Sequence, residues 1–389
     1  MRGQIDHVPA RQAARLAIGY AVAWTNDAGS IMSVSRCPDP REQTVALLWQ
    51  AMPPPVIDGI RKDPKPGGYA DSGADIAHAL RMAGLKVATP QAIHDPVRDM
   101  DRVFPDTPEG IAAARAAGAT LLWANTVLFT GHPLENAMDR CWIVGQLPAA
   151  MQEADDKFAT NARLRAAGLP VAASILAAPQ ARPGVHALAA LTPAALAALG
   201  LAFPLVVKPV RGRGSQGVTR VDDHATCMAT AAELVASGRF GDELIVEQFL
   251  EGAEMTVTVM PGDAPWALPP VLRFNHENGV APYNGIVAVS TNSRALSREE
   301  QAAPQVAAML EACVTAARLV EARAPVRIDC RAGADGVLRQ FDLNMKPNMT
   351  GAGRPGRDDQ DSLSAIAARA VGWDYRELLL RMLDGAWRA

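Results

Sequence analysis

Two segments near the C-terminal end of the chain carry acidic and amide side chains at alternating positions. Residues 326–330 and 338–344 are predicted to be strands. Successive side chains of a strand point to opposite faces, so Asp342 and Asn344 share one face of the second strand, and Asp329 lies on one face of the first. Carboxylate and amide oxygens of this kind suit Mg²⁺. The alternative is a half-exposed hairpin with a solvated polar face, since such alternation is common in antiparallel sheets.

We expect these two segments to pair with each other as a hairpin. The dipeptide Asp335-Gly336 between them is one that tight turns prefer. Pairing would bring Arg327 and Gln340 to the polar face that carries the carboxylates. Phe341 and Leu343 would then lie on the opposite, apolar face.

A basic, glycine-rich loop follows a buried strand farther upstream. The predicted strand 203–209 carries Lys208 near its end, and the loop 211–218 holds three glycines, two arginines and a serine. Glycines let backbone N–H groups approach a phosphate closely, and the basic side chains add charge. This is not a Walker loop, because no Gly-Lys-Ser/Thr follows at the required spacing. An ordinary turn is the alternative interpretation.

A third segment, 243–254, combines a hydrophobic strand, a glycine turn and two glutamates, Glu247 and Glu254, and a strand with alternating polarity follows at 255–260. Backbone groups of 248–250 could pair with the edge of an adenine, and a carboxylate could accept hydrogen bonds from ribose hydroxyls. Taken alone, this segment fits a surface hairpin with acidic corners better.

In combination, these segments resemble the ATP-grasp superfamily, and specifically its D-alanine–D-alanine ligase-like branch. The resemblance covers residues 150 to 380 and rests on the ordered set of motifs. In chain order the motifs are Asp156-Lys157, Leu164 to Pro170, Val206 to Pro209, the loop 212–218, Glu247 to Glu254, Arg327-x-Asp329 and Asp342-x-Asn344. The resemblance implies an α/β (α+β) chain with an ATP-grasp fold and an N-terminal parallel-sheet α/β domain.

The resemblance also implies ATP as the nucleotide, Mg²⁺ or Mn²⁺ as the metal, and a role for each matching residue. The implied nucleotide ligands are Lys157, Lys208, Gly214, Ser215, Gln216, Gly217, Glu247, Phe249, Leu250 and Glu254. The implied metal ligands are Asp329, Asp342 and Asn344, with an aspartate at 342 where the family usually has a glutamate. Either carboxylate can hold magnesium. The catalytic candidates are Arg327, Lys208 and Asn348.

The segment 345–357 departs from the pattern of the dipeptide ligases. Those enzymes place a Pro-Gly and a small-residue turn here, whereas this chain has Pro347-Asn348 and three additional cations, Lys346, Arg354 and Arg357. A guanidinium suits carboxylate or phosphate binding, so these cations predict an anionic group in a substrate and put a D-alanine acceptor in doubt. The alternative, with equal weight, is pairing with Asp358, Asp359 and Asp361.

Two other segments contribute candidates for substrate binding. Arg273, His276 and Tyr283 fall where the family has a loop that covers the active site, although the lysine found there in the ligases has no obvious counterpart. Asp71 and Asp75 follow a Gly-Gly pair in the part that resembles the first-substrate domain. Packing for the histidine, turn formation for the tyrosine and helix capping for the aspartates are the alternatives.

The N-terminal part alternates between predicted strands and helices. Strands at 44–49, 85–88 and 120–124 with helices at 74–83 and 107–117 imply a small parallel sheet with crossover helices. The apolar segment 14–24 is interpreted as part of a core. We divide the chain into an extension (1–43), an α/β domain (44–150), a small ATP-grasp subdomain (151–240) and a C-terminal catalytic subdomain (241–389).

The composition is that of a globular chain with more than one lobe. The 389 residues are 49% hydrophobic and 20% charged, with a net charge of −3, so nothing indicates a nucleic-acid or membrane-surface partner. No apolar run approaches the ~18 residues of a membrane span, and the N-terminus lacks a signal pattern. Five cysteines without CxxC spacing predict reduced thiols and a cytoplasmic protein. The sequence does not decide the oligomeric state, and a homodimer is one option.

The reaction implied by the resemblance is the ligation of a small carboxylate to a small amine, both amino-acid-like. The carboxylate would attack the γ-phosphate of ATP to give an acyl phosphate and ADP, and the amine would then displace phosphate. Such chemistry depends on positioning and charge stabilisation. The alternatives are an ATP-dependent carboxylase of the same fold and a non-catalytic nucleotide-binding protein.

Overall fold

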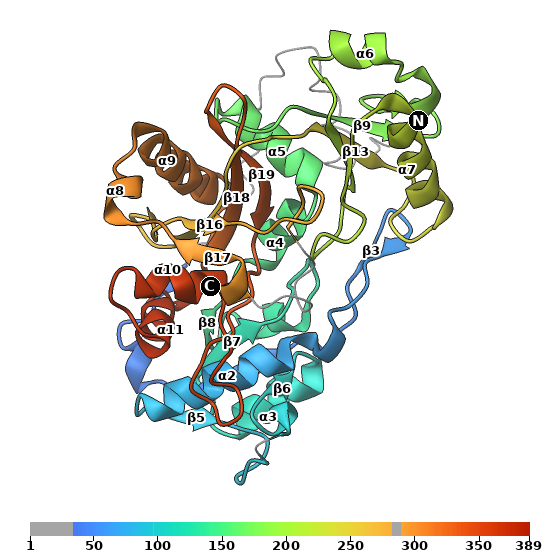
Figure 1. Ribbon diagram of the computed structural model, residues 1–389. Helices are drawn as coiled ribbons and strands as arrows, with labels where there is room; N and C mark the ends of the chain where they lie inside the picture. Colours follow the sequence, from blue (N-terminus) through green and yellow to red (C-terminus); the bar gives the residue numbers. More distant parts are fainter. Residues whose placement is uncertain (1–33, 96, 282–288) are drawn as a thin grey trace, which may run out of the picture.

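A computed structural model describes residues 34–95, 97–281 and 289–389 of the chain (Figure 1). The predicted core segment 14–24, most of the extension 1–43 and the candidate residue Tyr283 lie outside these ranges. The described part forms three main sheets and a small hairpin. No helix within the described ranges is long and apolar enough to cross a membrane.

The first sheet is built largely from parallel strands, as the alternation of elements predicted. Its order is β1-β20-β8-β7-β2-β5, with β6 also paired to β2. β2 runs parallel to β5, β6 and β7, and β7 runs parallel to β8, whereas β20 joins β8 and β1 in antiparallel fashion. The C-terminus of the chain therefore completes the N-terminal sheet. The strands are β1 (Ser35–Arg36), β2 (Val45–Trp49), β5 (Val87–Ala88), β6 (Phe104–Pro105), β7 (Leu121–Asn125), β8 (Trp142–Val144) and β20 (Trp387–Arg388).

Helices cover this sheet and account for its continuous apolar strands. The run 45–48 is fully buried, as expected for a parallel strand with both faces covered. Helix α2 (Ala70–Met82) begins earlier than the sequence predicted, and α3 (Pro108–Ala116) begins after Thr107, whose hydroxyl accepts a hydrogen bond from the N–H of Gly110.

A hairpin leaves the first sheet and reaches the second (Figure 1). It is formed by β3 (Val56–Ile57) and β4 (Ile60–Arg61). Just beyond it, Asp63 forms an ion pair with Arg239 at 2.6 Å. The proline-rich excursion predicted between 53 and 66 therefore bridges two parts of the molecule.

The second sheet has the order β10-β9-β13-β11-β12. Its strands are β9 (Ser174–Ala178), β10 (His186–Ala187), β11 (Leu205–Pro209), β12 (Thr219–Val221) and β13 (Leu244–Gln248), accompanied by α6 (Pro193–Ala198) and α7 (His224–Ala236). β13 lies beyond the predicted boundary at 240 but pairs with β11 and β9. The domain boundaries remain predictions.

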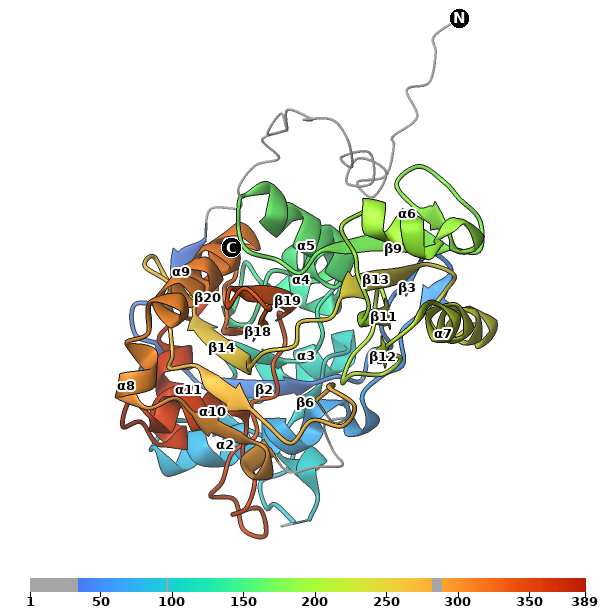
Figure 2. The same cartoon turned by 45° about the horizontal axis from the view of Figure 1, so that its top comes forward.

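The third sheet has the order β17-β16-β14-β18-β19, with β15 on β14. Its strands are β14 (Glu254–Met260), β15 (Trp266–Ala267), β16 (Val271–Arg273), β17 (Ser293–Ala295), β18 (Val326–Ala332) and β19 (Leu338–Asn344). The remaining helices are α4 (Pro148–Ala154), α5 (Lys157–Ala166), α8 (Arg298–Gln301), α9 (Pro304–Leu319), α10 (Leu363–Arg369) and α11 (Tyr375–Leu383). Figures 1 and 2 show α4 and α5 between the sheets.

The buried face of the third sheet packs against α9. Cys313 of α9 and Cys330 of β18 approach to 3.6 Å between their sulfur atoms. All five cysteines are buried and free, in agreement with the prediction of reduced thiols.

The hairpin of β18 and β19 forms as predicted, with one difference in register. Asp329 pairs directly with Asp342, but the next pair joins Cys330 to Gln340, so Phe341 is the extra residue of a β-bulge. Gln340 therefore moves to the buried side, where it is 2% exposed, and its predicted place on the polar face is wrong. A bulge adds one residue and so reverses the alternation that the sequence pattern assumes.

Candidate active site

A cavity of about 860 Å³ is lined by residues of the second and third sheets and by segments that follow strands of the first sheet, such as Gln50 after β2 and Leu128 after β7. Most of the residues predicted for function contribute to its wall. They are Asp71, Lys157, Lys208, Gly214, Ser215, Gln216, Glu247, Phe249, Leu250, Glu254, Arg273, Arg327, Asp329, Asp342, Asn344, Lys346 and Asn348. Five other predicted residues within the described ranges, Asp75, Gly217, His276, Arg354 and Arg357, are not part of the lining.

Lys208 projects from β11 and is fixed by two acceptors. Its ammonium group lies 2.6 Å from a carboxylate oxygen of Glu247 and 3.1 Å from the carbonyl oxygen of Phe341. Lys208 is 4% exposed and Glu247 is 3% exposed. Burial raises the pKa of Glu247, although Lys208 acts in the opposite direction. The second carboxylate oxygen of Glu247 has no hydrogen-bond partner within the described chain, so it could accept a donor from a ligand.

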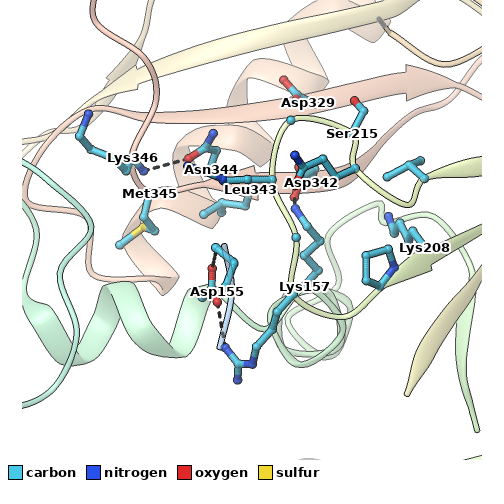
Figure 3. Close-up of a pocket in the computed structure, with 18 of the residues that line it drawn as sticks. Asp155, Lys157, Lys208, Ser215, Asp329, Asp342, Leu343, Asn344, Met345 and Lys346 are labelled. Carbon is cyan, nitrogen blue, oxygen red and sulfur yellow. Dashed lines mark hydrogen bonds and ion pairs between the residues drawn. The ribbon is translucent and has the colours of Figure 1, made fainter. Parts of the chain in front are cut away.

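Lys157 stands at the first turn of α5, directly after the capping residue Asp156. Its ammonium group forms an ion pair with Asp342 of β19 (Figure 3). Burial by itself would raise the pKa of Asp342, but Lys157 and Lys208 hold it below its ordinary value. Lys157 therefore contacts this carboxylate directly, and the charge of Lys208, from another element, also acts on it.

Arg327 and Asp329 share one face of β18, as the alternation predicted. The guanidinium lies 3.2 and 3.3 Å from the two carboxylate oxygens of Asp329. Thr256 of the neighbouring β14 donates its hydroxyl to the same carboxylate. Burial by itself would lower the pKa of Arg327, but Asp329, Asp342 and Glu254 together outweigh this effect and the net shift is upward. Arg327 is therefore held in place as a permanent cation.

The oxygens of Asp329, Asp342 and Asn344 fit a magnesium ion better than a transition metal. The two carboxylates lie on directly paired residues, and the Asn344 amide oxygen accepts the backbone N–H of Lys346 at 2.9 Å. No group of three His, Cys, Asp or Glu side chains suited to a metal occurs in the described ranges. Mg²⁺ commonly takes only one or two carboxylates and completes its shell with water and phosphate oxygens. The donor set therefore fits a metal that arrives with a nucleotide.

The glycine-rich loop lines the cavity along its whole length except at Gly217. Gly214 and Ser215 have positive φ values of 57° and 60°, and the N–H of Gln216 donates to the carbonyl of Arg213. Gly217 has a φ of 71°, and a Cβ at this position would lie 3.1 Å from Phe240 and 3.2 Å from Pro209, so a glycine suits both the backbone and the close packing here. Its role toward phosphate stays a prediction.

The predicted adenine hinge is only partly available in this arrangement. The N–H of Phe249 already donates to the carbonyl of Pro204 at 3.3 Å, so its predicted role toward adenine is not supported. The Phe249 ring lies between two guanidinium groups, Arg220 and Arg331, each 4.6 Å from its centroid. The remaining hinge prediction rests on Leu250, which lines the cavity.

His276 and Arg273 occupy different positions relative to the cavity. His276 lies 2.9 Å from a carboxylate oxygen of Glu254 and thus fixes a residue predicted to bind ribose. Arg273 is buried and lines the cavity directly. Burial lowers the pKa of Arg273, while Asp329 and Glu254 counteract this.

Arg354 and Arg357 have a structural role in place of the predicted role in substrate binding. Both guanidinium groups contact Asp75 of α2, at 2.7 and 2.8 Å. Asp75 is 1% exposed and also accepts the hydroxyl of Thr350. The pairing joins the loop after β19 to α2. It differs from both sequence interpretations, because Asp75 lies far away in the sequence.

Lys346 and Asn348 occupy the acceptor end of the cavity. Burial, followed by the charge of Lys65, lowers the pKa of Lys346 to about 7. The side-chain oxygen of Asn348 is buried without a hydrogen-bond partner in the described chain. Both side chains therefore have unused capacity for a ligand.

Sequence reasoning missed several residues of the cavity wall. Asp155 forms ion pairs with Lys62 and Arg211, the latter at 3.2 Å, and thus joins the excursion, α4 and the glycine-rich loop. Lys65 and Tyr69 also line the cavity. The available signal was the run Lys-Pro-Gly-Gly-Tyr before α2, in which we considered only the glycines and the following aspartates.

Solved structures confirm the fold. The D-alanine–D-alanine ligase of Bacillus anthracis superposes with a TM-score of 0.60 and 17% identity, covering 87% of this chain and 96% of that one. The VanG D-Ala:D-Ser ligase of Enterococcus faecalis gives a TM-score of 0.58 with 13% identity, over 88% and 98% of the two chains. The chain is therefore a protein of the ATP-grasp fold.

Sequence comparison narrows this class to a family. The model for the D-ala D-ala ligase C-terminus matches residues 164–384, so the chain belongs to that family. The D-alanine–D-alanine ligase of Stutzerimonas stutzeri is 31% identical over 198 residues, or 50% of this chain and 56% of the relative. That of Aromatoleum aromaticum is 34% identical over 193 residues, with the same coverage. The match thus spans about half the length of these curated relatives.

Proposed function

We propose that this protein is an ATP-dependent carboxylate–amine ligase that forms an amide bond through an acyl phosphate and releases ADP and phosphate. One observation carries the proposal. Lys157 forms an ion pair with Asp342, whose pKa the nearby Lys208 also lowers, and Asp342 is paired across two strands with Asp329, beside Arg327. Phosphate-binding cations and magnesium-binding carboxylates thus meet at one point, and phosphoryl transfer requires both.

Two cations of the cavity, Lys157 and Lys208, have carboxylate partners that the phosphates of a nucleotide could replace. Lys157 rests on Asp342, and Lys208 rests on Glu247. A triphosphate would give both lysines anionic partners and leave the carboxylates free for other ligands. The orphaned oxygen of Glu247 would then accept an amino group, as predicted for the adenine end.

Asp329, Asp342 and Asn344 would hold the magnesium. When bound, Mg²⁺ neutralises charge on the phosphate oxygens and orients the γ-phosphate. Arg327 is positioned by Asp329 close to the same place, so it would stabilise charge that develops on the reacting phosphoryl and acyl groups.

The acceptor end would bind the amine. Asn348 replaces the glycine of the dipeptide ligases and presents a buried, unpartnered oxygen to the cavity. This oxygen could accept a hydrogen bond from the N–H of an incoming amine and so hold the amine nitrogen near the acyl phosphate. Support for a ligase, in preference to a carboxylase or a binding protein, comes from this site and from the family match.

Both substrates would be small and amino-acid-like, and neither nucleic acid nor membrane would be a partner. The relatives named above are ligases of D-alanine, and the net charge of −3 offers no basic surface for a polyanion. A cytoplasmic location and a homodimer are further parts of the proposal. The free, buried cysteines support the former.

The decisive experiment measures ADP and phosphate release from ATP with pairs of amino acids, followed by mass spectrometry of the products. A condensed product formed in equal amount to ADP is expected. Asp329→Ala should abolish turnover and weaken binding of Mn²⁺ in the presence of nucleotide, as read by electron paramagnetic resonance. Full turnover by Asp329→Ala at saturating Mg²⁺ would refute the metal assignment.

A further inference from the structure

One corner of the cavity is cationic and lies apart from the groups assigned to the nucleotide. We call Lys65, Tyr69 and Lys346 the Tyr69 corner. The ammonium group of Lys65 lies 4.4 Å from the centroid of the Tyr69 ring, and that of Lys346 lies 4.2 Å from it. All three residues line the cavity. Two ammonium groups are therefore gathered around one aromatic ring.

The charge of this corner is incompletely balanced. Lys65 forms an ion pair with Asp71 at 3.2 Å. Lys346 contacts only the carbonyl oxygen of Pro347, at 3.4 Å, and no carboxylate in the described ranges lies within ion-pair distance of it. An ammonium group inside a cavity without an anion is energetically unfavourable. In its protonated form, Lys346 thus carries a positive charge that an anionic group of a ligand would meet.

The backbone that carries Tyr69 is held in a conformation that side-chain-bearing residues seldom adopt. Gly67, Gly68 and Tyr69 have φ values of 71°, 54° and 64°. A Cβ on Gly68 would lie 2.1 Å from the carbonyl oxygen of Gln50, and Asn125 donates to the carbonyl of Tyr69 at 2.8 Å. The surrounding packing imposes this conformation, and such strain persists where a side chain must be placed for function.

An unpartnered polar group lies on the same side of the cavity. Gln50, whose backbone N–H donates to the carbonyl of Gly68, is 6% exposed and lines the cavity. Its side-chain oxygen has no hydrogen-bond partner in the described chain. Buried amides are normally satisfied, so this oxygen indicates a ligand that also carries a hydrogen-bond donor, such as the amino group of an amino acid.

The Tyr69 corner is separated from the phosphate end by Asn344. Figure 3 shows Lys346 on one side of Asn344 and Lys157 with Asp342 on the other. The backbone N–H of Lys346 donates to the side-chain oxygen of Asn344, which fixes this order. An anion in the corner would therefore not be part of the triphosphate.

We propose that the Tyr69 corner binds a carboxylate of one co-substrate, separate from the carboxylate that is activated. This rests on the proposed ligase function and specifies its substrate class, an acidic amino acid or a dicarboxylic acid. A single carboxylate matches the single charge left over by Lys65, Lys346 and Asp71. Lys65 and Lys346 would bind the group through charge-assisted hydrogen bonds.

The test compares glutarate with its monoamide, in which a neutral amide replaces one of the two carboxylates, by calorimetry with ADP and Mg²⁺ present. Glutarate should bind the wild-type protein at least about tenfold more tightly, the ratio expected for one charge-assisted contact. Lys346→Met and Lys65→Met should each remove most of this preference. Lys86→Met, which changes an exposed lysine outside the cavity, should retain it.

Equal binding of the two probes by the wild type, or an undiminished preference in both cavity variants, would overturn the proposal. Circular dichroism of each variant establishes that it is folded. The proposed function fails by a separate result, namely no ATP cleavage with any acid and amine. In steady-state assays, kcat/KM for glutamate over glutamine should fall about tenfold in Lys346→Met while the KM for ATP stays unchanged.

Discussion

Arg327 and Lys208 are the cations whose surroundings differ most clearly in the cavity. Arg327 is held through two hydrogen bonds to Asp329, whereas Lys208 is held by Glu247 and a backbone carbonyl. A guanidinium group that makes two parallel hydrogen bonds to one carboxylate has a single orientation. An ammonium group, in contrast, can turn toward a new partner. We therefore expect Arg327 to act on the reacting group and Lys208 to act in nucleotide binding.

The substitution Arg327→Lys keeps the positive charge but removes the planar guanidinium group and its two hydrogen bonds to Asp329. Turnover should fall by a factor on the order of 10–10², because the donor is no longer aimed at the developing charge. Nucleotide affinity should change much less. The measurement sets ATP binding by calorimetry beside steady-state turnover, with the exposed Arg298→Lys as a control. Equal losses in binding and turnover would show that Arg327 is only a ground-state ligand.

Lys208→Ala removes a buried cation that meets Glu247. The KM for ATP should rise by about tenfold or more, with little effect on the KM for either co-substrate, because phosphate charge is what Lys208 meets. Thermal unfolding must be compared as well, since Glu247 loses its partner. Lys86→Ala is the matched control. Unchanged ATP binding together with weaker amine binding would contradict the placement of the nucleotide.

At the scale of elements, the sequence predicted regular alternation well and its interruptions poorly. The pairing of Asp329 with Asp342 followed from period two. Nothing in the sequence marks Phe341 as the extra residue, so Gln340 was assigned to the wrong face. The partner of Arg354 and Arg357 was equally out of reach, because Asp75 approaches only after α2 has packed beside the loop.

The same limit explains why Lys65 and Asp155 were missed. Both lie in segments with no alternation or helical period of their own, and their partners come from other elements. Spacing within one strand can be read from sequence. Proximity between an excursion, a helix end and a loop depends on tertiary packing.

Asp155 links three elements and should make their association sensitive to acid. Burial would raise its pKa, but Lys62 and Arg211 hold it below the ordinary value. A carboxyl group whose pKa is lower in the folded state than in the unfolded state stabilises the fold. This contribution is fully present above the unfolded pKa, near 3.9, and is lost as the pH falls through the folded pKa. Asp155→Asn should therefore lower the free energy of unfolding at pH 7 by about 1–2 kcal/mol.

The difference between wild type and Asp155→Asn should shrink below a pH of about 4. Urea unfolding of both proteins at neutral pH, near pH 4 and near pH 3 measures this difference in the free energy of unfolding. Asp263→Asn, in an exposed ion pair with Arg36, is the control and should change little at any pH. A difference that grows as the pH falls would show that Asp155 is not stabilised by its cations.

At the scale of the whole molecule, the cavity connects the core of the second sheet with two cores that the first and third sheets share. Its wall draws on segments that follow strands of the first sheet, on the excursion, on the second sheet with its glycine-rich loop, and on β18 and β19 of the third. A ligand that contacts all three walls binds only when they are assembled. Binding should therefore stabilise the assembled molecule as a unit.

A non-hydrolysable ATP analogue with Mg²⁺ should raise the unfolding temperature in a single transition. A ligand that binds only the folded state at 100 times its Kd contributes about 2.7 kcal/mol, which for a chain of this size is a shift of several degrees. Calorimetry with and without EDTA measures the metal-dependent part, because Asp329 and Asp342 would hold the ion against the phosphates. In Asp342→Asn the metal-dependent part of the rise in unfolding temperature should disappear. A smaller rise should remain, because Lys208 still binds the nucleotide. A rise confined to one of several transitions would mean that the ligand contacts only one wall of the cavity, and the placement of nucleotide across the three sheets would then be wrong.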